Sequence, residues 1–382
     1  MTRAATIEGT VAPGLEGVRE AFAANFTRGD DYEEVGAALC VYRRGEMVVD
    51  LWGGFADGAR TRAWTADTLV NVWSTTKTAA AVSIARLVGE GRIAYDQPVA
   101  EVWPEFAQAG KEAITIGLVM SHQAGLSGLV EPTTPDEFYD HDLIAARLAA
   151  QAPLFEPGTL NCYHAATYGF LTSEVVRRVT GQTLGAYFRD RIAGPIGSDF
   201  HIGLPASEDG RVAELIAAEH PAEVDIASLP RPVQLALSNP PMDPARVNSR
   251  AWRAADLPAL NGHAPARGVA RLCAALAGGG EIDGARVLST GALAQMTAVV
   301  ADRVDLLLGA NPQWGMGVLH NLIGIYGPNP RTYGHSGWGG SFGCADPDAE
   351  IAIGYVCNHM GPDLVGDPRT GGLNGALYAA LA

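Results

Sequence analysis

Apolar and polar positions alternate mainly in the two end regions of the chain, which is the pattern of half-buried strands. Residues 35–57 contain two such runs around a short glycine-containing turn, and this arrangement predicts a β-hairpin. Strand patterns return in the C-terminal third, and a last helix is predicted at residues 371–381. The C-terminal strand patterns occupy residues 313–320, 332–337 and 351–358. Strands at both ends predict one sheet assembled from distant parts of the sequence.

The middle of the chain has helical periodicity instead. A mostly apolar helix is predicted from near Ser74 to the glycines at residues 89–91. Further helices are predicted at residues 142–151, 167–180 and 266–277. Residues 200–265 differ because they hold nine of the 23 prolines, where an even spread would place about four. This segment is expected to be a long irregular excursion that walls a binding pocket.

The charge of the chain excludes two classes of partner. Its 382 residues include 42 acidic and 27 basic side chains, which give a formal net charge of −15. A surface this acidic repels phosphate backbones and anionic headgroups, so we expect neither nucleic-acid nor membrane-surface binding. No apolar run approaches the roughly 18–20 residues that cross a bilayer. The composition carries no prediction of the oligomeric state.

The cysteines and histidines predict neither disulfides nor a metal site. The five cysteines are dispersed without CxxC spacing, as is usual for the reduced thiols of a cytoplasmic protein. Residues 1–17 hold no apolar stretch of a secretory signal, which also favours a cytoplasmic location. The nine histidines form no HxH or HExxH pair, so we expect no metal, and no motif indicates a cofactor.

The basic residues are unusual in one respect, because 25 of the 27 are arginines and only Lys77 and Lys111 are lysines. Lys77 follows Ser74 by three residues where a loop becomes a helix, so the two side chains lie on one helical face. A desolvated lysine at this position can take the proton of the serine. The alternative is a serine N-cap followed by a surface lysine. Lys111 has no such partner and is interpreted as an ordinary surface residue.

Three short motifs resemble the boxes of the serine β-lactamase and DD-peptidase superfamily, in the same order and at similar spacing. They are WSTTK at residues 73–77, YHA at residues 163–165 and HSGWGG at residues 335–340. Residues 118–126 and 266–277 resemble structural signatures of the same superfamily, so the likeness covers nearly the whole chain. Within the superfamily, the pattern is most similar to the β-lactamase-like carboxylesterases called family VIII.

The resemblance implies an α/β fold of the α+β type, with a mainly antiparallel sheet flanked by helices and a mostly helical lobe. We expect residues 1–382 to form a single unit. Its sheet lobe would combine residues 1–70 with residues 266–382. Its helical lobe would span residues 71–265 and include the proline-rich excursion.

The resemblance also implies a mechanism. Ser74 would attack an ester carbonyl, and Lys77 and Tyr163 would share the general-base task. Tyr163 would then protonate the leaving alcohol and later activate water for deacylation. The backbone N–H groups of Ser74 and Trp338 would form the oxyanion hole. The substrate-binding strand and turn would comprise His335, Ser336, Gly337, Trp338 and Gly339.

Two departures from the superfamily pattern bear on the substrate. Ala165 stands where β-lactamases have an asparagine that contacts the acylamino side chain of the substrate. His335 stands where many relatives have a lysine, which would pair with a substrate carboxylate. Both changes favour a serine carboxylesterase that hydrolyses small neutral esters with short acyl chains. The alternatives are amide or β-lactam hydrolysis, acyl transfer to another alcohol, and an inactive penicillin-recognising binding protein on the same fold.

Ser341 is a second candidate nucleophile, because GGSFG at residues 339–343 fits the GxSxG elbow of α/β-hydrolases. That elbow needs a helix after the serine, whereas residues 344–348 have the composition of a turn before a strand. We therefore expect a β-hairpin here and retain Ser74 as the nucleophile. The neighbouring polar residues interpreted as structural are His122, Cys162 and His164.

Overall fold

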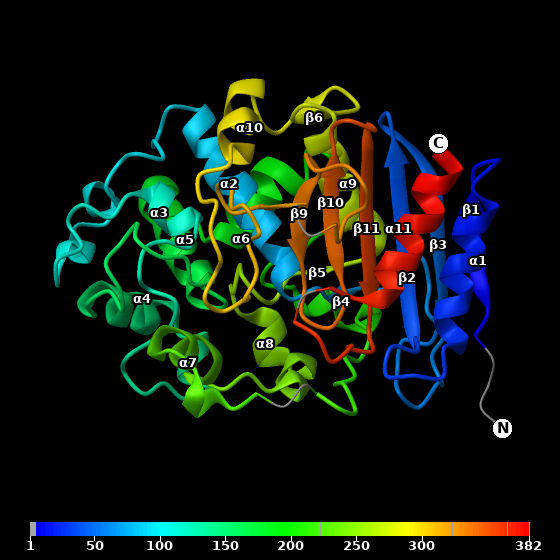
Figure 1. Ribbon diagram of the computed structural model, residues 1–382, viewed down its shortest axis with the longest axis horizontal. Coiled ribbons are helices and arrows are strands. Elements are labelled where there is room, and N and C mark those ends of the chain that lie inside the picture. Colours follow the sequence, from blue (N-terminus) through cyan, green and yellow to red (C-terminus); the bar gives the residue numbers. More distant parts are fainter. Residues whose placement is uncertain (1–4, 222–223, 322–323, 365, 382) are drawn as a thin grey trace.

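The computed structural model describes residues 5–221, 224–321, 324–364 and 366–381. Its centre is a seven-stranded antiparallel sheet with the strand order β1-β3-β2-β11-β10-β9-β8 (Figure 1). The strands are β1 (Ile7–Val11), β2 (Gly36–Arg43), β3 (Glu46–Gly54), β8 (Leu319–His320), β9 (Tyr333–Ser336), β10 (Phe342–Asp346) and β11 (Ile351–Cys357). Because β2 pairs with β11 along its length, the two ends of the sequence meet in the middle of the sheet.

Helices cover both faces of this sheet. α9 (Ala266–Ala277) packs against β2, β10 and β11, while α1 (Glu16–Ala24) and α11 (Pro368–Leu381) pack together on the opposite face (Figure 1). β2 and β11 are buried along nearly their whole length because both faces are covered. α9 lies close to β11, since a Cβ atom on Gly354 would lie 2.5 Å from the backbone nitrogen of Ala270.

The remaining helices surround α2 (Lys77–Gly89), which is buried on nearly every side. Its small residues at positions 79–81 let α5, α6 and α10 pack closely around it. The other helices are α3 (Ile116–Met120), α4 (His141–Ala150), α5 (Thr167–Thr180), α6 (Leu184–Phe188), α7 (Arg231–Ser238), α8 (Arg250–Ala254) and α10 (Thr290–Thr297). Two short ladders complete the fold: β4 (Val70–Asn71) with β5 (His263–Ala264), and β6 (Glu281–Ile282) with β7 (Ala285–Arg286). Among the described helices, none has the length and apolar character needed to cross a membrane.

Most predicted elements are present. The hairpin predicted at residues 35–57 is β2 and β3, and the helices predicted at residues 167–180 and 266–277 have the same bounds as α5 and α9. The mainly antiparallel sheet flanked by helices is the predicted fold class. Residues 200–265 contain only short described elements, among them α7 and α8. The division into lobes at residues 70 and 265 stays a prediction.

The strand predicted at residues 313–320 is wrong for most of its length. Only β8 at its end pairs in the sheet. Gln313 and Gly317 have φ values of +48° and +87°, which are incompatible with extended backbone. The chain instead turns twice, and this places the Trp314 ring in the core, where its indole N–H donates to Asp305 at 3.3 Å.

The interpretation of Lys111 as a surface residue is also wrong. Its side chain is fully buried, and Nζ donates to the carbonyl oxygens of Gln108, Ala149 and Gln151 at 2.7, 2.9 and 2.6 Å. These three bonds tie the end of α4 to the loop before α3. Both lysines of the chain are therefore buried, and each donates to backbone carbonyls.

Candidate active site

Ser74 directly follows Trp73, whose backbone is strained, in a turn that packs against β9. Trp73 has φ +46°, which a non-glycine residue rarely adopts, and Ser74 then begins a 3₁₀ turn that leads into α2. Thr76 in this turn accepts a hydrogen bond from the backbone N–H of Gly262 at 2.8 Å, which ties the turn to the segment before β5. Ser74 remains 8% exposed, so its hydroxyl is reachable from only one side.

Lys77 lies one helical turn further on and is fully buried. Its Nζ atom is 3.1 Å from Ser74 Oγ, 2.7 Å from the Ala165 carbonyl oxygen and 3.1 Å from the Ala259 carbonyl oxygen. Burial lowers the pKa of Lys77 well below its usual value, because removal from water disfavours the charged ammonium form. A neutral amine can donate to the two carbonyls and keep its lone pair for the serine hydroxyl.

Tyr163 completes this group from the other side. Its ring centroid is 4.7 Å from Lys77 Nζ, and its ring stacks on Trp314 at 5.7 Å with an interplanar angle of 4°. Burial raises the pKa of Tyr163 well above its usual value, and the nearby Ser74 hydroxyl partly opposes this shift. The Tyr163 phenol therefore stays protonated in the resting site. It can lose its proton only when a negative charge develops on the substrate or a cation lies close to it.

The edge of β9 and the turn after it form the opposite wall. His335 donates from Nδ1 to the Ser336 carbonyl at 2.9 Å, and burial lowers the pKa of His335 to about 3, so its imidazole is neutral. The Trp338 indole packs against Trp73 with ring centroids 5.1 Å apart. In the part of the chain that the structure describes, the backbone N–H groups of Trp338 and Ser74 donate to no other group.

Known proteins share this sequence and fold along nearly the whole chain. The family described as Beta-lactamase matches residues 21–374. The chain belongs to the β-lactamase family. This confirms the resemblance of the three motifs and the fold class that it implied.

Three proteins similar to this chain bear the names of esterases and of a penicillin-binding protein homologue. Esterase/beta-lactamase LipL of Mycobacterium tuberculosis (strain ATCC 25618 / H37Rv) is 40% identical over 345 residues, which are 86% of this chain and 78% of that protein. The solved structure of a family VIII carboxylesterase is 46% identical, with a TM-score of 0.93 over 98% of this chain and 100% of that one. A penicillin-binding protein homologue from Caulobacter crescentus is 44% identical, with a TM-score of 0.90 and the same coverage.

The pocket beside Ser74 is small and largely apolar. It encloses about 280 Å³ of empty space. Its lining residues are Ser74, Tyr163, Leu308, Trp314, Leu319, His335, Ser336, Trp338 and Leu364. Gly337 and Gly339 do not line this pocket: a Cβ atom on Gly337 would contact Ser341 Oγ, and the Gly339 carbonyl accepts from Arg369 on the far side of the turn.

The prediction that the proline-rich excursion walls this pocket is wrong. Of the described residues that line it, none comes from residues 200–265. The wall is instead built by the turns that follow α10 and by Leu364. The excursion contributes behind the site, through the Ala259 carbonyl that accepts from Lys77 and through Trp252, whose ring packs 5.5 Å from that of Trp73.

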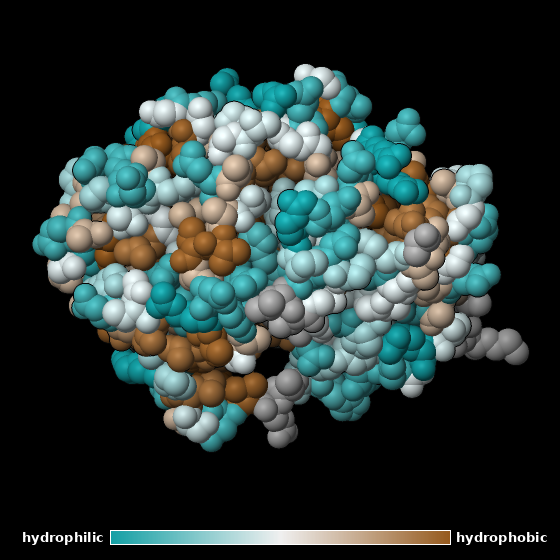
Figure 2. Space-filling view, turned by 45° about the horizontal axis from the view of Figure 1, so that its top comes forward, coloured by the Kyte–Doolittle hydropathy of each residue, from teal (hydrophilic) through white to brown (hydrophobic). Residues whose placement is uncertain are grey.

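Two apolar side chains on neighbouring segments are exposed at the surface. Leu160 is 40% exposed and Val304 is 60% exposed. They lie on adjacent segments, because Asn161 and Asp305 form a parallel β-bridge. On the face shown in Figure 2, hydrophobic residues occur as separate patches among hydrophilic ones.

Asp305 is the main residue of this site that the sequence did not indicate. Its buried carboxylate accepts from the backbone N–H of Tyr163 at 3.1 Å and from the indole N–H of Trp314 at 3.3 Å. One side chain therefore holds both the tyrosine and the ring stacked on it. A single carboxylate within an apolar run at residues 304–308 was the only signal available in the sequence.

His122 and His164 form a buried support under Tyr163. His122 Nδ1 accepts from the backbone N–H of His164 at 3.1 Å, and His164 Nε2 accepts from the backbone N–H of Leu126 at 3.2 Å. Burial lowers the pKa of His164 to about 4 and that of His122 well below its usual value, so both rings are neutral. Cys162 is buried beside them, and burial raises the pKa of its thiol to about 12.

Ser341 has the hairpin context that the sequence predicts. It lies in the turn between β9 and β10, and its Oγ donates to the Val72 carbonyl at 2.9 Å. Its other side-chain partner is the Thr75 hydroxyl at 3.2 Å, so no base is beside it. The serine of the GxSxG match thus connects the turn to the segment before Ser74.

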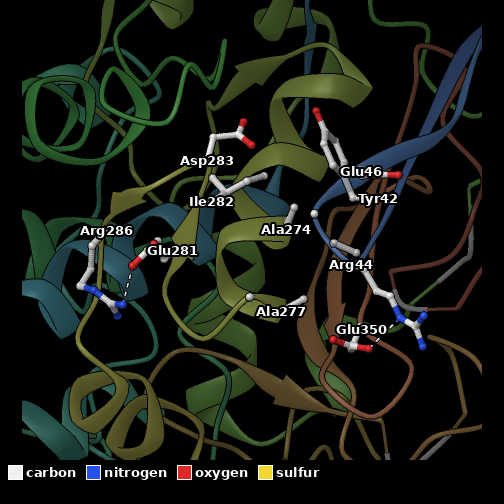
Figure 3. Close-up of a pocket in the computed structure, with 13 residues that line it drawn as sticks. Tyr42, Arg44, Glu46, Ala274, Ala277, Glu281, Ile282, Asp283, Arg286 and Glu350 are labelled. Carbon is white, nitrogen blue, oxygen red and sulfur yellow. Dashed lines mark hydrogen bonds and ion pairs between the residues drawn. The ribbon is translucent and has the colours of Figure 1, made fainter.

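A second, wider hollow lies elsewhere, at the turn that joins β2 to β3, beside α9 (Figure 3). It is open to solvent, spans about 1050 Å³ and shares no lining residue with the pocket at Ser74. Its charged residues pair with one another across its rim, as Arg44 does with Glu350 at 2.9 Å. It holds no nucleophile with an adjacent base.

Proposed function

We propose that the chain is a serine carboxylesterase that hydrolyses small neutral carboxylic esters through an acyl-enzyme on Ser74. The observation that carries the proposal is the 3.1 Å contact between Lys77 Nζ and Ser74 Oγ, in which the amine is buried and its other partners are both carbonyls. The named esterases among the relatives support the same reaction class.

Acylation starts with the neutral Lys77 amine. Its lone pair accepts the Ser74 proton while Oγ bonds to the ester carbonyl carbon, and the carbonyl oxygen becomes an oxyanion. The free N–H groups of Ser74 and Trp338 donate to that oxyanion. Removing one such donor from an oxyanion hole costs about 10²–10³-fold in kcat, so the two N–H groups account for a large share of the rate.

Tyr163 serves the leaving group. It gives its hydroxyl proton to the departing alkoxide, and the protonated Lys77 returns a proton to the phenolate. In deacylation the same pair takes a proton from water, hydroxide adds to the acyl carbon, and Ser74 leaves with its proton restored. A cation 4.7 Å from the ring centroid favours the transient phenolate.

The electrostatics of the pocket favour a neutral substrate. His335 presents a neutral imidazole where a lysine would attract a substrate carboxylate, because burial lowers the pKa of His335 to about 3. Ala165 offers its carbonyl to Lys77 and no side-chain amide to the substrate. The leucines and Trp314 around about 280 Å³ of space favour short acyl chains.

A second candidate is β-lactam hydrolysis on the same serine, favoured by the names of two relatives, an esterase/beta-lactamase and a penicillin-binding protein homologue. Acyl transfer to another alcohol would use the same acyl-enzyme. An inactive binding protein would leave Ser74 unreactive toward a fluorophosphonate probe.

The test compares initial rates on p-nitrophenyl acetate, butyrate and decanoate and on nitrocefin. We expect turnover of the acetate and butyrate, a much lower rate on the decanoate, and loss of all ester turnover in Ser74→Ala. Ser341→Ala is the matched control and should retain activity. Nitrocefin turnover that exceeds ester turnover, or ester turnover retained in Ser74→Ala, would contradict the proposal.

We also propose a cytoplasmic location. All five cysteines are buried and unpaired, which supports a reducing compartment. Alkylation of the protein in cell extract under denaturing conditions should modify five thiols without prior reduction. Protection of any pair of cysteines would contradict this location.

A further inference from the structure

A buried arginine lies directly behind the turn that carries the Trp338 N–H. Arg369 lies in the first turn of α11, and its side chain has no exposed surface. Its Nη2 atom donates to the Gly339 carbonyl at 2.6 Å, one residue after Trp338. Its Nη1 atom donates to the His359 carbonyl at 2.9 Å. The guanidinium therefore joins the turn after β9 to the segment after β11.

Two carboxylates hold the guanidinium in place. Asp367 accepts from Nε at 2.9 Å and from Nη2 at 2.6 Å, and Glu34 accepts from Nη1 at 3.0 Å. Glu34 is itself buried and also accepts from the Tyr355 hydroxyl. Burying charges in this way costs free energy that the pair recovers only when the geometry is well satisfied. All three nitrogens of Arg369 have acceptors, so the planar fork has one defined orientation.

The turn itself depends on outside support. Gly339 and Gly340 have φ values of +85° and +124°, and because glycine has no Cβ atom its backbone can also adopt other conformations. The Gly339 carbonyl accepts from Arg369 and also from the backbone N–H of Gly361 at 2.9 Å. A Cβ atom on Gly340 would lie 2.4 Å from Arg369 Nη2, so the guanidinium packs against the turn without a gap.

We propose that Arg369 is a positioning residue for the oxyanion hole: by holding the Gly339 carbonyl, it fixes the turn that directs the Trp338 N–H toward the carbonyl oxygen of the substrate. This inference rests on the proposed function, because it assigns Trp338 its role there. Arg369 touches no substrate itself. Its effect should appear in transition-state stabilisation rather than in substrate binding.

The test uses the full-length chain with Arg369→Lys and Arg369→Gln. Lysine keeps the charge but cannot reach the Gly339 carbonyl, Glu34 and Asp367 together. The matched control is Arg147→Gln, which removes another largely buried arginine, held by Glu137 at 3.0 Å on the far side of α4. Each variant is measured for kcat and KM on p-nitrophenyl butyrate, for affinity toward an alkylboronic acid, and for Tm.

We expect both Arg369 variants to lose about 10²-fold in kcat with KM within about twofold of wild type, and to bind the boronic acid correspondingly more weakly. Arg147→Gln should lower Tm while kcat and boronic-acid affinity stay within about twofold. A merely structural role of Arg369 predicts a lower Tm with kcat unchanged in the folded fraction, and that result overturns the proposal. Failure of both variants to fold would also count against it.

Boronic-acid binding separates this inference from the proposed function, because binding needs no turnover. If the wild type binds the boronic acid but hydrolyses no ester, the proposed function fails. The Arg369 variants would then still be compared by affinity alone. Equal affinity of wild type and Arg369→Gln would overturn the positioning role in either case.

Discussion

Lys77 Nζ lies 3.1 Å from Ser74 Oγ, and its two remaining contacts are the carbonyl oxygens of Ala165 and Ala259. The two carbonyls fix the N–H bonds of a neutral amine and leave its lone pair directed at the serine. This geometry explains why a chain with 25 arginines has a lysine here. An arginine stays protonated and could not accept the proton.

Lys77→Arg should therefore fold but lose about 10²–10⁴-fold in kcat, which is the range of general-base catalysis. The measurement is the pH profile of kcat/KM on p-nitrophenyl butyrate. The wild-type profile should rise with pH and level off well below the ordinary pKa of lysine, because burial lowers the pKa of Lys77. An active Lys77→Arg enzyme, or a wild-type profile that rises only near the ordinary lysine pKa, would contradict this role.

Tyr163→Phe should affect poor leaving groups most. The phenylalanine keeps the stack on Trp314 but has no hydroxyl to protonate the alkoxide. We expect a loss of about 10²–10⁴-fold in kcat on ethyl butyrate and a smaller loss on p-nitrophenyl butyrate, whose leaving group needs no proton. The two kcat ratios, variant to wild type, check this. Equal losses on both esters would indicate that Tyr163 acts at another step.

The motif residues could be predicted because their chemistry depends on local spacing. Ser74 and Lys77 are one helical turn apart, so their contact follows from helix geometry once the helix is recognised. The position of α9 follows from its apolar periodicity in the same way. The hairpin context of Ser341 could also be read locally, from the turn residues that follow it.

The supporting groups could not be predicted, because they depend on contacts between distant segments. The acceptors of Lys77 are backbone carbonyls, which every residue has, so no side-chain pattern marks Ala165 or Ala259. The bond from Tyr163 to Asp305 and the bond from Arg369 to Gly339 join residues that are 142 and 30 positions apart in sequence. The burial of Lys111 could not be predicted for the same reason, since its three carbonyl partners have no signature in the sequence.

Lys111→Met should test stability without touching the reaction. It would leave three buried carbonyls without their donor, so we expect the free energy of unfolding to fall by roughly 2–4 kcal/mol. Urea denaturation of wild type and variant gives this difference, and kcat on p-nitrophenyl butyrate should stay within about twofold. A change in kcat without a change in stability would contradict a structural role for Lys111.

Buried neutral histidines should make the fold sensitive to acid. Burial lowers the pKa of His263 to about 3, whereas its pKa in the unfolded chain is near 6.5. Below pH 6.5 the unfolded chain binds a proton that the folded chain does not, so stability falls as the pH falls. Between pH 7 and pH 5 this one group should cost about 2 kcal/mol.

Urea unfolding of His263→Gln at these two pH values checks the slope. The variant should lose about 2 kcal/mol less than wild type between pH 7 and pH 5. His220→Gln is the control, because His220 is exposed and its pKa is raised by Asp31 rather than lowered by burial. Equal pH dependence in wild type and His263→Gln would contradict a buried neutral imidazole.

The covalent intermediate on Ser74 tests the whole account most directly. A p-nitrophenyl ester is mixed with the enzyme, quenched in acid within milliseconds, and digested for mass spectrometry. We predict that the acyl mass is found on the peptide containing Ser74, is absent in Ser74→Ala, and persists in Ser341→Ala. An acyl group on any other residue, or ester hydrolysis without an acylated Ser74 peptide, would contradict the account.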